Sequence, residues 1–421
     1  MSLTLDDHDR ALLDGEAGPA SQQAMRILTR MGELFGAESM IDISRAHIDS
    51  SIYLGLAGLE FAERLADQGA KVAVPTTLNV SGLDEHGWQA WSVPPDWAEN
   101  ARRQMAAYVR MGCLPTWTCA PYQTEHAPSF GEQIAWGESN AIVYANSVLG
   151  ARTERYPDFL DTCAALTGRV PAYGLHLEAN RAGEILFPLT GLPEPLQHED
   201  ALYPVLGFFI GGAAGDRVPV IDGMETRPTD DQLKALGAAA ASSGNVGLFH
   251  WVGVTPEAST REAAFHGRPP ASTIMVSMDE LRRAREHLVT ARGGELDMVV
   301  LGSPHFSLNE FRALAPLLEG ERRHPRVEFL VTTSRAAAHL ARQAGLLDSF
   351  EAFGGRLTVD TCILASPMLP SNIRRLMTNS GKYAYYAPGM LNAEVAFGSL
   401  ADCVRSAIEG RVVVDEALWN A

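Results

Sequence analysis

The chain has 421 residues, enough for two or three domains, and its apolar fraction of 46% and charged fraction of 20% are those of an ordinary globular protein. It contains 34 Lys and Arg residues and 51 Asp and Glu residues, which give a net charge of −17. This charge argues against a nucleic-acid partner, because clustered basic side chains bind nucleic acids. No signal-peptide core opens the sequence and no stretch reaches the ~20 apolar residues of a membrane span, so we expect a cytoplasmic protein that binds no membrane.

The predicted elements alternate between helices and short apolar strands. A helical pattern opens the chain, followed by strands at residues 40–43 and 71–75. Three nearly continuous apolar runs follow later, at 297–301, 327–331 and 357–359. Such runs between helices are typical of parallel sheets that are covered on both faces, which predicts an α/β fold.

A domain seam is predicted in the glycine-rich stretch near residues 200–220. It divides the chain into a region 1–210, which contains Cys119 and the segment 138–153, and a region 211–421, which contains Ser303, Cys362 and Lys382.

Polar side chains recur directly after the predicted strands. In parallel α/β sheets, ligand sites gather where strands end, so several of these loops are expected to converge on one cleft. The residues concerned are His47, Thr76, Asn79, Ser303, His305 and Cys362.

Five cysteines are scattered through the chain, at positions 113, 119, 163, 362 and 403. An odd number without local pairing argues against a disulfide framework in a reducing compartment. Cys119 and Cys362 follow turn-like and strand-end sequences, but they are too far apart for a zinc ribbon. By spacing alone, a free cysteine is more often a small buried apolar residue than a metal ligand.

The segment 137–153 combines Ser139, Asn140, Asn146 and Ser147 with apolar residues and ends in a Gly-Ala-Arg-Thr turn. It is explained either as a buried helix whose polar side chains bond the backbone, or as a binding segment in which Arg152 clamps a carboxylate. Both interpretations stay open from the residues alone.

Residues 378–389 resemble a phosphate-binding loop only at first sight. The first glycine of that motif is missing and no clear strand precedes it, so a nucleotide site is not predicted. Lys382 is then either a surface lysine or a contact for an anionic substrate.

Taken together, these segments resemble aconitase X, the divergent branch of the aconitase superfamily. The resemblance rests on stretches such as Thr118-Cys119-Ala120-Pro121-Tyr122 and Leu301-Gly302-Ser303-Pro304-His305, and it runs in order from residue 13 to residue 389. The other matching stretches are 13–16, 44–47, 74–79, 131–141, 144–153, 173–176, 360–362, 378–380 and 386–389.

The resemblance implies aconitase-like three-layer α/β/α domains around a central metal-binding cleft. Its three metal-ligand positions fall on Cys119, Ser303 and Cys362, where relatives often have cysteine at the second position. Because thiolates normally hold iron–sulfur centres, the serine favours a [2Fe-2S] cluster or mononuclear iron over a [4Fe-4S] cluster.

The family also implies a hydro-lyase that removes water from a small hydroxy acid. The serine and the missing phosphate cradle favour cis-3-hydroxy-L-proline as substrate, converted to Δ1-pyrroline-2-carboxylate, over (R)-5-phosphomevalonate. A non-catalytic iron-binding subunit is a third hypothesis. The expected catalytic residues are His47, Ser380 and Lys382. The expected substrate-binding residues are Ser44, Thr76, Thr77, Asn79, Glu138, Ser139, Asn140, Asn146, Ser147, Arg152, Thr153 and His176.

Family members also carry a small swivelling domain with a Gly-Ser-Ser-Ser-type loop. No such run occurs in this sequence, so we expect a separately encoded small subunit to complete the active site.

Overall fold

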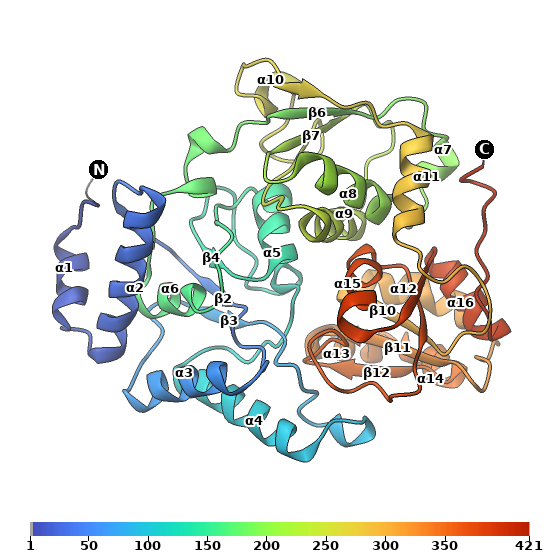
Figure 1. Cartoon of the computed structure of the whole chain (residues 1–421), viewed down its shortest axis with the longest axis horizontal. Coiled ribbons are helices and arrows are strands. Elements are labelled where there is room, and N and C mark those ends of the chain that lie inside the picture. The colour runs from blue at the N-terminus through green and yellow to red at the C-terminus, as the bar shows by residue number, and fades with distance from the viewer. Residues whose placement is uncertain (1–2, 421) are drawn as a thin grey trace.

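The computed structural model describes residues 3–420, arranged in three regions that each contain a parallel sheet (Figure 1). The α/β fold expected from the sequence is confirmed. No helix among these residues has both the length and the apolar character that crossing a membrane requires.

The first region is built on the sheet β3-β2-β4 and a small antiparallel pair of β1 with β5. It occupies the blue and teal part of Figure 1, where α2 packs against α6 and α3 packs against α4. The strands are β1 Met40–Asp42, β2 Ala46–Ile48, β3 Thr76–Leu78, β4 Ala135–Trp136 and β5 Arg169–Pro171. The helices are α1 Asp7–Asp14, α2 Pro19–Phe35, α3 Leu56–Asp67, α4 Pro95–Arg110, α5 Ser139–Tyr144 and α6 Leu160–Thr167.

The second region has the parallel sheet β8-β7-β6-β9, over which α8 and α9 pack against each other. Its strands are β6 Ile185–Pro188, β7 Pro219–Asp222, β8 His250–Trp251 and β9 Ser272–Thr273. Its helices are α7 Glu194–Gln197, α8 Leu202–Ala214, α9 Asp230–Ser243, α10 Arg261–Ala264 and α11 Met278–His287.

The predicted seam at 210/211 lies inside α8. Strand β6 precedes this position and pairs with β7, which follows it, so the two sides of the seam belong to one sheet.

The third region is a three-layer sandwich around the parallel sheet β12-β11-β10-β13-β14. Met298 and Val300 of β10 belong to the core shared with α15, while Val299 and Leu301 belong to the core shared with α12, α14 and α16. Since alternate residues of a strand face opposite sides, helices cover both faces. The strands are β10 Met298–Phe306, β11 Glu328–Thr333, β12 Arg356–Val359, β13 Arg375–Thr378 and β14 Glu394–Phe397. The helices are α12 Leu308–Leu318, α13 Arg335–Gln343, α14 Leu347–Phe353, α15 Gly381–Leu391 and α16 Leu400–Glu409.

Two sequence-based details are wrong. The strand predicted at 71–75 is β3 at Thr76–Leu78, because Pro75 has no N–H to give a ladder and the amides of Val72 and Ala73 bond outside any strand. The loop predicted after residue 301 is instead the irregular end of β10.

Candidate active site

Three loops meet around His305, near the end of β10. The His305 amide donates to Cys119 Sγ at 3.2 Å. Its Nε2–H donates to the Thr361 carbonyl at 3.1 Å, because a carbonyl can only accept, and Nδ1 therefore accepts from Thr118 Oγ1 at 3.1 Å. One side chain thus ties the Cys119 loop, the Ser303 loop and the Cys362 loop together. We call these residues and their direct neighbours the His305 cluster.

The backbone of all three loops is in an uncommon conformation. Gly302 has φ +96°, and an added Cβ would lie 2.0 Å from the Thr332 carbonyl oxygen, so only glycine fits before Ser303. The residues two positions before the cysteines, Trp117 and Asp360, have φ values of 44° and 63°. Non-glycine residues with positive φ gather at sites where the surrounding structure enforces a special geometry.

A buried ion pair lies beside the two thiols. Lys382 Nζ is 2.5 Å from Glu138 Oε1, and neither side chain is more than 15% exposed. Burial raises the pKa of Cys119 to about 12, Glu138 adds to this, and Lys382 opposes it. Burial likewise raises the pKa of Cys362, and Lys382 again opposes it. The two thiols also affect each other's titration, which places them in one electrostatic environment.

Glu138 and Asn140 are held at the start of α5. Glu138 is the N-cap residue and accepts from the Ala141 amide at 2.9 Å. Asn140 donates to the Cys119 carbonyl at 3.0 Å and accepts from Tyr122 Oη at 2.7 Å. Ser139 Oγ lies 3.4 Å from Glu138. This end of α5 therefore positions both the ion pair and the first cysteine loop.

His47 lies inside β2, rather than in the loop expected after a strand. Its Nδ1 is 2.8 Å from Thr77 Oγ1, and Thr77 Oγ1 also lies 3.4 Å from the Ala46 carbonyl. Nε2 is buried and has no hydrogen-bond partner. Burial lowers the pKa of His47 to about 3, with a small opposing contribution from the backbone of Thr118, so the ring is neutral.

Asn79 and Asp49 form a second incompletely satisfied pair. Asn79 Nδ2 donates to Asp49, while its Oδ1 is buried without a partner. Burial and the nearby carboxylates of Glu138 and Asp161 raise the pKa of Asp49 well above its usual value. Asp49 was not among the residues picked from the sequence, although it follows β2 directly and the end of a parallel strand is the expected place for it.

Ser380 begins α15 and contacts the Ser303 loop. Its hydroxyl donates to the Ser303 carbonyl and accepts from the Tyr383 amide at 3.1 Å. A cavity of about 600 Å³ opens beside these two serines. Its lining includes Ser303, Ser380, Asn379, Asp200, Asp231 and Lys234.

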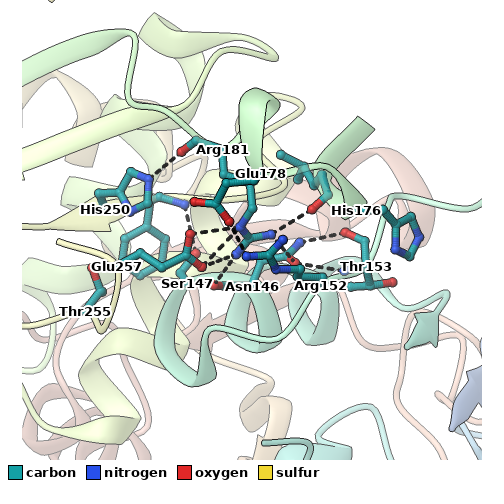
Figure 2. A network of polar contacts seen from close by, with 12 residues as sticks. Asn146, Ser147, Arg152, Thr153, His176, Glu178, Arg181, His250, Thr255 and Glu257 are labelled. Carbon is teal, nitrogen blue, oxygen red and sulfur yellow. Dashed lines mark hydrogen bonds and ion pairs between the residues drawn. The ribbon is translucent and has the colours of Figure 1, made fainter. Parts of the chain in front are cut away.

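The remaining expected binding residues do not contact either cysteine. Ser44 bonds Glu132 and the Gln133 carbonyl, and Thr76 Oγ1 donates to the Val74 carbonyl at 2.8 Å. The others belong to a separate network around Arg181, shown in Figure 2. These are Asn146, Ser147, Arg152, Thr153 and His176.

In this Arg181 network, most polar groups bond one another, although Arg152 Nε and His250 Nδ1 are buried without a hydrogen-bond partner. Arg181 is fully buried, pairs with Glu257 at 2.5 Å and donates to both the side chain and the carbonyl of Asn146. Arg152 pairs with Glu178. Residues 145–149 form a π-helical turn after α5, ending at Gly150 with φ +69°. Of the two interpretations that the sequence left open, the structure shows the buried helix with a glycine stop.

The donor set at the His305 cluster is small. Within residues 3–420, no three or more His, Cys, Asp or Glu side chains gather so as to hold a metal ion. Two thiols and the Ser303 hydroxyl remain, and both ring nitrogens of His305 are already bonded to protein. This set is smaller than the four thiolates that usually hold an iron–sulfur cluster, so a metal bound here would need further ligands to complete its shell.

Family models match almost the whole chain in three parts. These are the aconitase X first domain at residues 2–179, the second domain at 183–286 and the third domain at 296–409. The parts coincide with the three regions of Figure 1.

Similar proteins fall into two groups. The chain is 48% identical to a cis-3-hydroxy-L-proline dehydratase of Pseudomonas aeruginosa and 46% identical to one of Hypocrea jecorina, and it covers 72% and 69% of their lengths. It is 37% identical to the phosphomevalonate dehydratase large subunit of Methanothermobacter thermautotrophicus and covers 98% of it. These three matches span 99%, 97% and 95% of this chain.

A solved structure agrees with these matches. The crystal structure of Thermococcus kodakaraensis aconitase X in its holo-form superposes with a TM-score of 0.86 at 33% identity, covering 96% of this chain and all of the other. The chain therefore belongs to the aconitase X family.

Proposed function

We propose that this chain is the large part of a hydro-lyase that dehydrates cis-3-hydroxy-L-proline to Δ1-pyrroline-2-carboxylate. The observation that carries the proposal is the His305 cluster, where two thiols, a serine and a buried Lys–Glu pair meet. The higher identity to the hydroxyproline dehydratases than to the phosphomevalonate dehydratase large subunits supports this substrate. Phosphomevalonate is the alternative substrate within the family.

We propose that Cys119, Ser303 and Cys362 hold iron, as a [2Fe-2S] cluster or a single ion. Burial raises the pKa of both thiols more than Lys382 lowers it, and a bound cation would offset this cost of the thiolate. When bound, iron supplies a Lewis acid that eases departure of the substrate hydroxyl.

The residues around the thiols then have distinct parts in the chemistry. His47, whose Nε2 has no hydrogen-bond partner, is the proposed acceptor of the proton alpha to the carboxylate. Lys382 keeps its proton, since Glu138 raises its pKa although burial alone would lower it. It therefore stabilises negative charge that develops on the substrate and is unsuited to be the base. Ser380, bonded at both its oxygen and its proton, positions the Ser303 loop.

We propose a separate small subunit as partner. The chain covers nearly all of the archaeal relative named a large subunit but only about 70% of the two hydroxyproline dehydratases. The part of those dehydratases that this chain does not cover has the size of a further domain, which suits the swivelling domain of the family. The five free cysteines suit the cytoplasm, a reducing compartment.

The test is to purify the chain anaerobically with its small subunit, measure iron per chain, and assay both substrates. We expect iron to be bound, hydroxyproline to be turned over, and the large subunit alone to be inactive. Turnover of phosphomevalonate alone would replace the proposed substrate. Iron binding without turnover of either acid would favour the non-catalytic hypothesis.

A further inference from the structure

One arginine beside the His305 cluster has no partner. Arg155 is half-buried, and its Nη1 is shielded from solvent without a hydrogen bond. Its only hydrogen bond within residues 3–420 is from the backbone amide, to Glu154. Burial lowers the pKa of Arg155, and Tyr386, Glu138 and Glu154 offset only part of that effect.

Other buried or half-buried arginines of the molecule have partners: most pair with acids, while Arg102 and Arg323 donate to backbone carbonyls. Arg169 contacts Asp6, Asp9 and Asp42, and Arg335 contacts Asp360 and Glu85. Arg181 contacts Glu257. Because an unpaired buried charge is strongly unfavourable, the lack of an acid at Arg155 marks a site where an anion from outside the chain would bind.

The acids nearest to Arg155 are already occupied. The Glu154 carboxylate accepts from the amides of Arg155 and Leu175 at 2.7 and 2.8 Å. Glu138 is taken up by Lys382 and by the amide of Ala141. Neither can turn to the guanidinium without giving up the bonds that shape the site.

The aliphatic part of the Arg155 side chain packs against the backbone. An added Cβ at Gly247 would lie 3.7 Å from both Cγ and Cδ of Arg155, so the stem packs over this glycine. The Gly247 carbonyl is itself fixed by Asn146 at 2.9 Å. The Arg181 network thus supports the side chain of Arg155, which gives the buried 146–153 segment a positioning role.

We propose that Arg155 binds the carboxylate of the substrate, a role that rests on the proposed function. Arg155 lies two residues after Thr153, whose hydroxyl accepts from the Trp136 amide at 3.1 Å, and Trp136 precedes Glu138 by two residues. A carboxylate at Arg155 is therefore expected near the Lys382–Glu138 pair. Its planar guanidinium offers paired N–H donors that match a carboxylate. Arg152, the carboxylate clamp predicted from the sequence, already pairs with Glu178.

The test compares L-proline with L-prolinamide, which lacks the carboxylate, as ligands of the assembled enzyme. We expect Arg155→Gln to weaken L-proline binding on the order of 10- to 100-fold, as for the loss of hydrogen bonds to a charged group, and to leave prolinamide binding unchanged. Arg155→Lys should recover part of the preference, and KM for hydroxyproline should rise more than kcat falls.

Two further variants, Arg30→Gln and Arg152→Gln, serve as controls. Arg30→Gln removes an exposed arginine and should behave as wild type. Wild-type L-proline affinity in Arg155→Gln would overturn the proposal, as would loss of the preference in Arg152→Gln but not in Arg155→Gln.

A second readout does not depend on the substrate. Removing an unpaired buried charge should raise the unfolding temperature of the ligand-free Arg155→Gln enzyme, and acetate in place of chloride should stabilise wild type but not this variant. If wild type fails to dehydrate hydroxyproline yet shows this acetate effect, the proposed function fails and the carboxylate site stands. If the acetate effect is the same in both proteins, the carboxylate site fails.

Discussion

The His305 cluster and the Arg181 network are both buried and rich in polar residues, and both contain buried atoms without a hydrogen-bond partner, but they differ in whether their arginines are paired with acids. In the Arg181 network each guanidinium has its carboxylate, and Asn146 uses both its amide and its carbonyl oxygen. At the His305 cluster and its rim, His47 Nε2, Asn79 Oδ1 and Arg155 Nη1 have no partner.

This difference separates a structural site from a binding site. An arginine that is already paired with a carboxylate in the free protein gains little from an acidic ligand. An unpaired arginine and two thiols of raised pKa are stabilised when an acid and a cation bind. The residues of the 146–153 segment are then more important for placing Arg155 and α5 than for touching substrate.

The largest expected effect comes from removing a thiol. Cys119→Ala should lower the iron content and reduce kcat by at least about 1,000-fold, since the Lewis acid contributes several kcal/mol. Iron analysis and turnover of the assembled enzyme measure it.

Cys163→Ala is the matched control, because Cys163 is also a buried free thiol but packs in the core of the first region. It should lose some stability and keep its iron. If Cys119→Ala retained full iron and turnover, the assignment of this cluster as the metal site would be wrong.

A change in the Arg181 network should act on stability instead. Arg181→Met leaves Glu257 buried without a partner, and breaking a buried ion pair in this way costs about 3–5 kcal/mol. Denaturant unfolding should show this loss.

The double variant Arg181→Met, Glu257→Gln also removes the unpaired carboxylate of Glu257 and should recover part of the stability. A double variant no more stable than Arg181→Met would contradict the explanation by an uncompensated carboxylate.

The parallel sheets were predictable because their strands are short, apolar and followed by polar residues. The pairing of Cys119 with Cys362 was accessible only through resemblance to a family, since nothing local to either residue marks it. The chain closes this contact through His305, whose bonds to Thr118 and Thr361 join segments far apart in the sequence.

Arg152 and Arg155 show a second limit of prediction from sequence. Both follow the same glycine turn, and a helix or loop pattern cannot tell which guanidinium meets Glu178 and which is left open. That outcome depends on where Glu178 of the first region and Gly247 of the second region come to lie, which the packing of the two regions determines.

The smallest expected effect concerns pH. Burial, with Arg181 and Arg152 nearby, lowers the pKa of His176 to about 3 in the folded chain. Below pH 6.5 the unfolded chain therefore takes up a proton that the folded chain does not, and stability falls with pH from 6.5 towards 3. By pH 5 the loss is about 2 kcal/mol from this histidine.

His176→Gln removes that proton uptake while keeping a side chain that can bond Gln133 and Tyr156. Urea unfolding between pH 7 and pH 5 should show a shallower loss of stability in this variant, by about 2 kcal/mol. His8→Gln, at an exposed histidine, should leave the slope unchanged. Equal slopes in wild type and His176→Gln would mean that the ring is already charged inside the Arg181 network, and the contrast with the unsatisfied His305 cluster would lose its basis.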